Sequence, residues 1–176
     1  TLRVKAPLFV YRQWHRSRTQ SYVERSGRYT ELPPEFYEPE DSVFTKGNPS
    51  LDKEPITLHT CKNPDDFVDA GFGLEMYDTP DHPWSWKGYF KNHQNFIRGW
   101  YEHWLGTGVR KELARINLPV SQYSEMYVTT DLRNWFHWLK LRLSNHAQWE
   151  IRQYGNAVFE LLKEVAPAAC KAFEDY

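Results

Sequence analysis

Cysteine is scarce in this sequence of 176 residues, which contains two thiols, Cys61 and Cys170, far apart along the chain. Two such residues do not form the dense disulfide framework of a small secreted domain. We therefore interpret them as unpaired thiols in a reducing compartment and expect a cytoplasmic protein. Neither cysteine lies beside a base or within a recognisable motif, so the sequence offers no obvious catalytic thiolate.

Long apolar runs and a dominant charge are also missing. No run approaches the ~20 apolar residues that a membrane-spanning helix requires. We expect no signal peptide. Because the chain opens within an alternating segment, we also expect preceding sequence to be missing. The formal net charge is −1, whereas proteins that wrap duplex nucleic acid are usually basic. The histidines show no metal-ligand spacing such as H-E-x-x-H. We therefore expect no membrane, nucleic acid or metal among the partners.

The hydrophobic periodicity that is present predicts one α+β domain, residues 1–176, in which helices dominate. Asp131 and Asn145 stand where helix N-caps belong. A long loop or insertion is predicted at 42–83, where Gly, Pro, Asn and Asp recur. Alternation predicts strands at 1–5 and 122–130, and a loop or short irregular strand is predicted at 21–29. Helical spacing predicts one helix that begins at Pro7 and others at 86–105, 109–119, 132–143, 146–165 and 168–176.

Aromatic residues are abundant, with eight tryptophans, eleven tyrosines and ten phenylalanines. Large rings bury much area each, and flat rings also suit flat ligands. We interpret most of them as parts of the core and of subunit contacts. Along the helix predicted at 86–105, the rings that recur at helical spacing mark the face that we expect to be buried, namely Tyr89, His93, Phe96, Trp100 and Trp104.

The densest chemical signal is a cluster of arginines in the stretch "RQWHRSRTQSYVERSGRYTEL", which begins at Arg12. Five arginines alternate there with aromatic residues, and Glu24 is the one acid before Tyr29. In a chain that is neutral overall, this local concentration favours a small anionic ligand such as a nucleotide phosphate. Nucleic-acid binding and plain solvent exposure are the alternatives.

Within this cluster, Arg16-Ser17-Arg18 is followed by seven residues and then by Ser26. The pattern resembles the R-H-R-x7-S signature of the flavin-dependent thymidylate synthases, with Ser17 at the position of the histidine. The resemblance to this family extends to the flanking segments "KAPLFVYRQW" and "SGRYTEL" and to the downstream block "RINLPVSQYSEMYVTTDLRNWFHWLKLRLSNHAQWEIRQY". The resemblance covers roughly residues 4–37 and 108–176. It implies that family's fold, helix-dominated around a small antiparallel sheet.

The resemblance also implies an activity. In the family, carbon 5 of the uracil ring of dUMP is methylated to give dTMP, with FAD as cofactor, methylenetetrahydrofolate as carbon donor and NADPH as reductant. This chemistry needs no cysteine nucleophile, because the cofactor performs the difficult step. Four subunits assemble in the family and share their active sites, so a homotetramer is implied here.

By resemblance, Arg142 is the catalytic residue that faces the uracil ring, where a permanent cation favours the ionised, activated form. The implied nucleotide-binding set is Gln13, Arg16, Glu24, Arg25, Ser26, Gly27, Arg28, Arg115 and Arg142. The implied flavin-binding set is Arg16, Ser17, Arg18, Glu24, Asp131, Leu132, Arg133, His137 and His146.

Several alternatives stand beside these assignments. Arg133 and His137 share one side of a predicted helix and could form a solvated face. Arg142 could pair with Glu150, and Glu24 could simply balance its arginine neighbours. At the level of the whole protein, the alternatives are a UMP/dUMP C5-methylase of nucleoside antibiotic (polyoxin) biosynthesis, a family member without turnover, and a non-catalytic module that binds RNA or single-stranded DNA.

Overall fold

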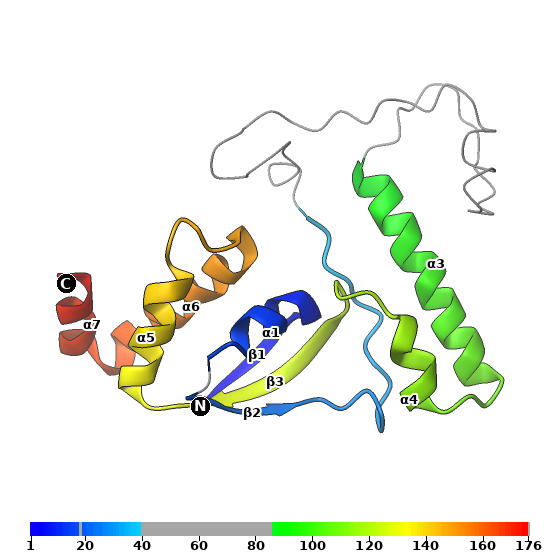
Figure 1. Ribbon diagram of the computed structural model, residues 1–176, viewed down its shortest axis with the longest axis horizontal. Helices are drawn as coiled ribbons and strands as arrows, with labels where there is room; N and C mark the ends of the chain where they lie inside the picture. Colours follow the sequence, from blue (N-terminus) through cyan, green and yellow to red (C-terminus); the bar gives the residue numbers. More distant parts are fainter. Residues whose placement is uncertain (18, 40–85, 176) are drawn as a thin grey trace. The chain divides into compact units, whose positions relative to one another are not determined.

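The computed structural model describes residues 1–17, 19–39 and 86–175 of the chain (Figure 1). Thr1–Tyr37 and Phe96–Tyr176 form one compact unit, and Glu38–Asn95 form another. All described residues of the predicted active site belong to the first unit, to which the following account is restricted except for the start of one helix. Arg18, Cys61 and the predicted loop at 42–83 lie outside the described residues.

A three-stranded antiparallel sheet forms the base of this unit. Its strands are β1 (Leu2–Pro7), β2 (Ser21–Glu24) and β3 (Tyr123–Thr129), in the order β1-β3-β2. Along β3 the alternate residues Ser124, Met126 and Val128 are buried, as the period of two predicts. The small antiparallel sheet and the strands predicted at 1–5 and 122–130 are therefore confirmed.

Helix α1 (Leu8–Trp14) follows β1 directly and packs over the sheet (Figure 1). We expected the helix to begin at Pro7, but Pro7 is the last residue of β1 and has an extended backbone, with φ −68° and ψ 150°. The amide groups of Leu8 and Phe9 donate instead to the carbonyl oxygens of Gln122 and Val120, at 3.0 and 2.9 Å. These bonds satisfy donors that a helix start leaves free and bind α1 to the segment before β3.

The core lies between the sheet, α1 and two later helices, α5 (Leu132–Arg142) and α6 (Trp149–Val165). Trp14 and Trp138 are fully buried, and their ring centroids lie 4.3 Å apart. The buried Tyr11 hydroxyl lies within hydrogen-bond distance of the carbonyl oxygens of Val4 and Ser124. Tyr11 therefore ties α1 to both β1 and β3.

The two expected N-caps have different outcomes. The Asp131 side chain accepts a hydrogen bond of 2.8 Å from the backbone N–H of Asn134, so it caps α5 as predicted. Asn145 does not cap α6, because it lies in a turn that begins at Ser144 and the N-cap position falls on Gln148. The final helix, α7 (Pro167–Glu174), begins with a proline in its first turn, where the missing N–H is harmless.

Helix α3 (Trp86–Gly106) has the predicted bounds to within one residue, but the predicted buried face is wrong. Phe96 and Trp100 are 51% and 50% exposed, whereas Tyr101 is 2% exposed. The buried face is rotated because the Tyr101 hydroxyl and the Arg98 guanidinium hydrogen-bond the backbone of Leu32. No helix in the described ranges is long and apolar enough to cross a membrane.

The helix predicted at 109–119 is present as two short pieces. These are α4 (Lys111–Ala114) and the 3-10 helix η2 (Arg115–Asn117), which ends before Pro119. The change of helix type places Arg115 at the junction, where its side chain leaves α4 toward the loop that follows β2.

Candidate active site

The backbone carbonyl of Gln13 joins two of the predicted site residues. It belongs to the last turn of α1, where helix carbonyls lack intrahelical partners. A terminal nitrogen of Arg142, Nη2, donates to it at 2.7 Å, and the backbone N–H of Arg16 donates to it at 3.4 Å. Residues 129 positions apart in sequence are thereby brought together.

Arg142 is a half-buried cation at the C-terminal end of α5. Its Nε is buried without a hydrogen-bond partner in the described part of the chain, and burial lowers the pKa of the guanidinium. The group still carries its charge at neutral pH, because the ordinary value is so high. The alternative pairing with Glu150 is not found among the described ion pairs; Glu150 instead accepts a hydrogen bond of 2.9 Å from the Tyr37 hydroxyl. Arg142 is thus available to an anionic ligand.

A second contact to Gln13 comes from a residue that sequence reasoning missed. The side-chain Nε2 of Gln13 donates to Oε1 of Gln148, at the N-terminus of α6. Gln148 is exposed and has no periodicity or motif that marks it, although it lies within the block "NHAQWEIRQY" that carries the family resemblance. We name Gln13, Arg16, Arg142 and Gln148 the α1-end group.

The loop after β2 and the α4–η2 junction form a second group, which we name the glycine-loop group: Ser26, Gly27, Arg28 and Arg115. A Cβ atom added to the buried Gly27 would lie 3.0 Å from Cδ of Arg115 and 3.3 Å from the Leu32 side chain. The absence of a side chain at Gly27 therefore lets Arg115 pack across this loop. Arg28 lies on the exposed side of the loop, where its guanidinium contacts the Glu112 carboxylate at 3.4 Å.

Glu24 interacts electrostatically with His15, just after α1, and with Arg115 of the glycine-loop group. Partial burial raises the pKa of its carboxyl, while the charges of His15 and Arg115 and the neighbouring Ser124 hydroxyl act in the opposite direction. Arg115, from a distant segment, is therefore the arginine whose charge favours the ionised form of Glu24. Arg25, by contrast, bonds within its own loop, to the Thr30 hydroxyl and to the Glu31 carbonyl oxygen.

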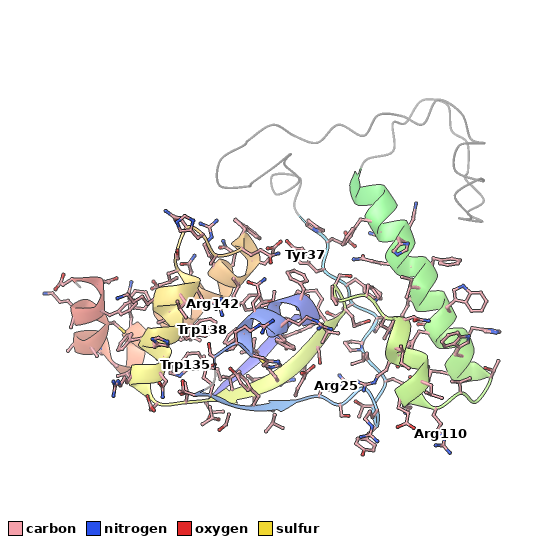
Figure 2. All side chains as sticks on the ribbon, in the orientation of Figure 1. Arg25, Tyr37, Arg110, Trp135, Trp138 and Arg142 are labelled. Carbon is pink, nitrogen blue, oxygen red and sulfur yellow. The ribbon has the colours of Figure 1, made fainter. Side chains whose placement is uncertain are left out.

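Figure 2 shows that Arg142 and Arg25, two of the predicted arginines, lie in different parts of the chain. Arg142 lies beside α5 with Trp135 and Trp138, whereas Arg25 lies on the loop beyond the far end of β2 (Figure 2). The α1-end group is therefore built around the helices, and the glycine-loop group is built around η2. A single chain does not gather all the predicted arginines at one point.

The predicted flavin-binding residues make separate contacts within the described part of the chain. Both carboxylate oxygens of Asp131 accept hydrogen bonds from Asn134, at 2.8 Å each. The Arg133 and His137 side chains are exposed on α5, as in the alternative of a solvated face. Of the remaining members, Leu132 packs against the core, Ser17 uses its carbonyl oxygen to accept from the Tyr22 hydroxyl, and His146 is exposed in the turn before α6.

Comparison with known proteins gives a consistent result. The family model described as "Thymidylate synthase complementing protein" matches residues 1–168. The flavin-dependent thymidylate synthase of Thermus thermophilus is 40% identical over 182 residues, which cover 98% of this chain and 55% of that protein. The enzyme of the same name from Dictyostelium discoideum is 37% identical, covering 97% of this chain and 50% of that protein. The chain thus spans about half the length of these relatives.

Among solved structures, the UMP/dUMP methylase PolB of Streptomyces cacaoi bound with 5-Br dUMP is similar to this chain, with a TM-score of 0.75 and 25% sequence identity. The match covers 99% of this chain and 69% of that one. The fold of that methylase and the family model agree with the arrangement of helices around a small antiparallel sheet. This chain therefore belongs to the flavin-dependent thymidylate synthase family.

Proposed function

We propose that this chain carries the nucleotide-binding part of an FAD-dependent methyltransferase that converts dUMP to dTMP, with methylenetetrahydrofolate as carbon donor and NADPH as reductant. The observation that carries the proposal is the α1-end group, in which Arg142 is a half-buried cation without a carboxylate partner among the described residues. Family membership supports the assignment of this cation to the uracil ring.

Arg142 performs the activating step in this proposal. Carbon 5 of uracil is a weak nucleophile, and it becomes a stronger one when the ring loses its imide proton. A fixed cation stabilises the resulting anion without exchanging a proton, and partial burial strengthens this attraction. The bond to the Gln13 carbonyl holds the guanidinium in place before the nucleotide binds, which limits the reorganisation that catalysis requires.

In this proposal, the glycine-loop group binds the phosphate of the nucleotide. Ser26 offers a hydroxyl, and Arg28 and Arg115 offer planar guanidinium groups that match phosphate oxygens. Gly27 allows the close approach of Arg115. Because this group lies apart from the α1-end group within one chain, we propose that a homotetramer completes each site from more than one subunit. The exposed rings of Phe96 and Trp100 are consistent with subunit contacts.

The donor set of the proposed flavin site fits the pyrophosphate of FAD. Arg16, Arg133 and His137 are exposed, and none of the three forms an ion pair within the described ranges. Their free N–H groups would bind phosphate oxygens of the cofactor. When bound and reduced, FAD would supply the hydride that completes the methyl group.

A protein thiol is not required in this proposal, and one of the two cysteines is poorly placed to supply it. Cys170 is a buried residue of α7 that is 1% exposed, and burial raises the pKa of its thiol. Both effects suppress the thiolate, which is the nucleophilic form.

UMP is a second candidate substrate, because the similar structure from Streptomyces cacaoi is a UMP/dUMP methylase. The relatives named above do not support a module that binds RNA or single-stranded DNA. The deciding experiment is the visible spectrum of the purified protein, followed by turnover with dUMP and UMP in the presence of methylenetetrahydrofolate and NADPH. We expect a flavin spectrum that NADPH bleaches and methylation of dUMP. A colourless protein that takes up no added FAD would refute the proposal, and faster turnover of UMP would favour the second candidate.

A further inference from the structure

Gln148 lies next to the proposed uracil site without an assigned role. It is the N-cap residue of α6, with φ −55° and ψ 143°, and its side chain is exposed. The Gln148 side chain accepts a hydrogen bond from the Gln13 side-chain amide, while Arg142 donates one to the Gln13 backbone carbonyl. The ends of α1, α5 and α6 thus contribute one residue each to the same small region.

The hydrogen-bonding capacity of this pair is only partly used. A glutamine amide offers one oxygen acceptor and an NH₂ group with two donor hydrogens. Gln13 uses one hydrogen to bond the Gln148 oxygen. In the part of the chain that the structure describes, the Gln148 NH₂ group has no recorded partner, and it points away from Gln13 because the oxygen on the same carbon points toward it. A free donor therefore lies at the exposed edge of the α1-end group.

We propose that Gln148 is a specificity-determining residue that donates a hydrogen bond to the C4 carbonyl oxygen of the uracil ring, while its own amide oxygen holds the Gln13 amide. This inference rests on the proposed function, because it places the uracil ring beside Arg142. The C4 carbonyl neighbours the imide nitrogen that Arg142 would stabilise as an anion. Two donors along this edge share the negative charge, which spreads from the nitrogen onto the carbonyl oxygen.

The same arrangement discriminates against cytosine. Cytosine carries an amino group at carbon 4, so two donors would face each other and the Gln148 donor would lose its acceptor. Unpaired polar groups in a binding site reject a ligand far more strongly than a missing methyl group does. Gln148 therefore selects the base that can be methylated by this route.

The test uses the substitution Gln148→Glu, which keeps an oxygen for the Gln13 amide and replaces the donor by a negatively charged acceptor. Dissociation constants for dUMP and dCMP are measured by calorimetry on the holoenzyme. We expect dUMP to bind at least about tenfold more weakly and the preference for dUMP over dCMP to fall by about tenfold or more. The variant Gln148→Ala should lose the preference in the same direction, without the added charge.

The matched control is Gln153→Ala, an exposed glutamine of the same helix whose side chain donates a hydrogen bond to the backbone carbonyl of Trp149. It should leave both dissociation constants unchanged. A second readout is the ultraviolet spectrum of bound 5-bromo-dUMP, whose absorption shifts when the imide ionises. Gln148→Glu should move that ionisation to higher pH, an effect that a merely structural role would not produce.

The outcomes separate the two proposals. If the wild type binds dUMP and ionises 5-bromo-dUMP but both Gln148 variants keep the wild-type preference over dCMP, this inference is wrong and the proposed function stands. If the wild type binds neither nucleotide, the proposed function fails and the inference fails with it. Circular dichroism shows whether each variant is folded.

Discussion

At the residue scale, the protein places the Arg142 cation where neither solvent nor a carboxylate of the described residues fully satisfies it. Arg142 is fixed by a single strong bond to a backbone oxygen, and its Nε remains buried without a partner in the described residues. Partial burial costs free energy that an ion pair would normally offset. An anionic ligand would offset the same cost, which links this residue to binding rather than to stability.

Arg142→Lys is predicted to lower kcat by about a hundredfold, because a lysine keeps the charge but cannot match the planar contact of the guanidinium. Steady-state kinetics with saturating dUMP measures this effect. Arg12→Lys is the control, since Arg12 is an exposed residue of α1 outside both groups. Full activity in the Arg142 variant would remove this residue from catalysis.

Cys170→Ala is predicted to leave kcat and KM within about twofold of wild type while lowering the free energy of unfolding by about 1 kcal/mol, the cost of a small buried cavity. Turnover and urea unfolding measure the two effects separately. Because burial raises the pKa of this thiol, the native protein should also resist alkylation of Cys170 at neutral pH. Loss of turnover in a folded variant would contradict the thiol-free mechanism.

At the element scale, the ends of helices and strands place the candidate residues. Arg142 ends α5, Gln148 precedes α6, and Gln13 lies in the last turn of α1. Such ends leave backbone groups free, and in this unit those groups hold side chains from distant elements. The loop after β2 follows the same principle, since Gly27 makes room for Arg115 from η2.

Gly27→Ala is predicted to displace the Arg115 side chain and to weaken dUMP binding by about tenfold, with a loss of stability below about 1 kcal/mol. The added Cβ would lie within 3.0 Å of a flexible side chain, which can move, rather than of backbone. Calorimetric titration with dUMP tests the prediction.

The control for that variant is Gly99→Ala, in the middle of α3, where a new Cβ meets nothing within 4 Å. Alanine favours the helix there by up to about 1 kcal/mol, so the thermal midpoint should rise slightly and dUMP binding should be unchanged. Equal affinities for dUMP in the two variants would argue against a role of the glycine loop in phosphate binding.

Local rules predicted some of these elements and failed at others. Asp131 was predictable because capping chemistry involves only neighbouring residues. The buried face of α3 was not, since periodicity cannot choose between adjacent aromatic rows; the hydrogen bond between Tyr101 and Leu32 decides it. The contact of Arg142 with Gln13 runs through a backbone oxygen, and Gln148 is an exposed polar residue. Neither leaves a pattern in the sequence, so family resemblance was needed to place Arg142 and did not reveal Gln148.

At the scale of the whole molecule, the separation of the two groups within one chain is the main feature. Arg142 lies by α5 and α6, and Arg115 lies at η2 beneath the glycine loop. We propose that one nucleotide contacts both groups because a second subunit supplies one of them. The proposed tetramer is therefore part of the proposed chemistry.

Mixed tetramers of two inactive variants, Arg142→Lys and Arg115→Ala, are predicted to recover part of the activity, because some sites then receive both intact groups. Co-expression with two different tags allows the mixed species to be purified and assayed. Activity no greater than that of each variant alone would show that one subunit supplies both groups, and the separate variants serve as the baseline.

The hydrogen bond between Arg142 and the backbone oxygen of Gln13 has a consequence for mutagenesis. Every amino acid carries the oxygen that accepts this bond, so exchanging the glutamine cannot delete the anchor; only the amide beyond it changes. Variants with every amino acid at position 13 should therefore differ in how well they recognise the base, while Arg142 stays in its position. The activity of these variants would therefore report the effect of the residue 13 side chain on base recognition, because the position of the Arg142 charge is unchanged.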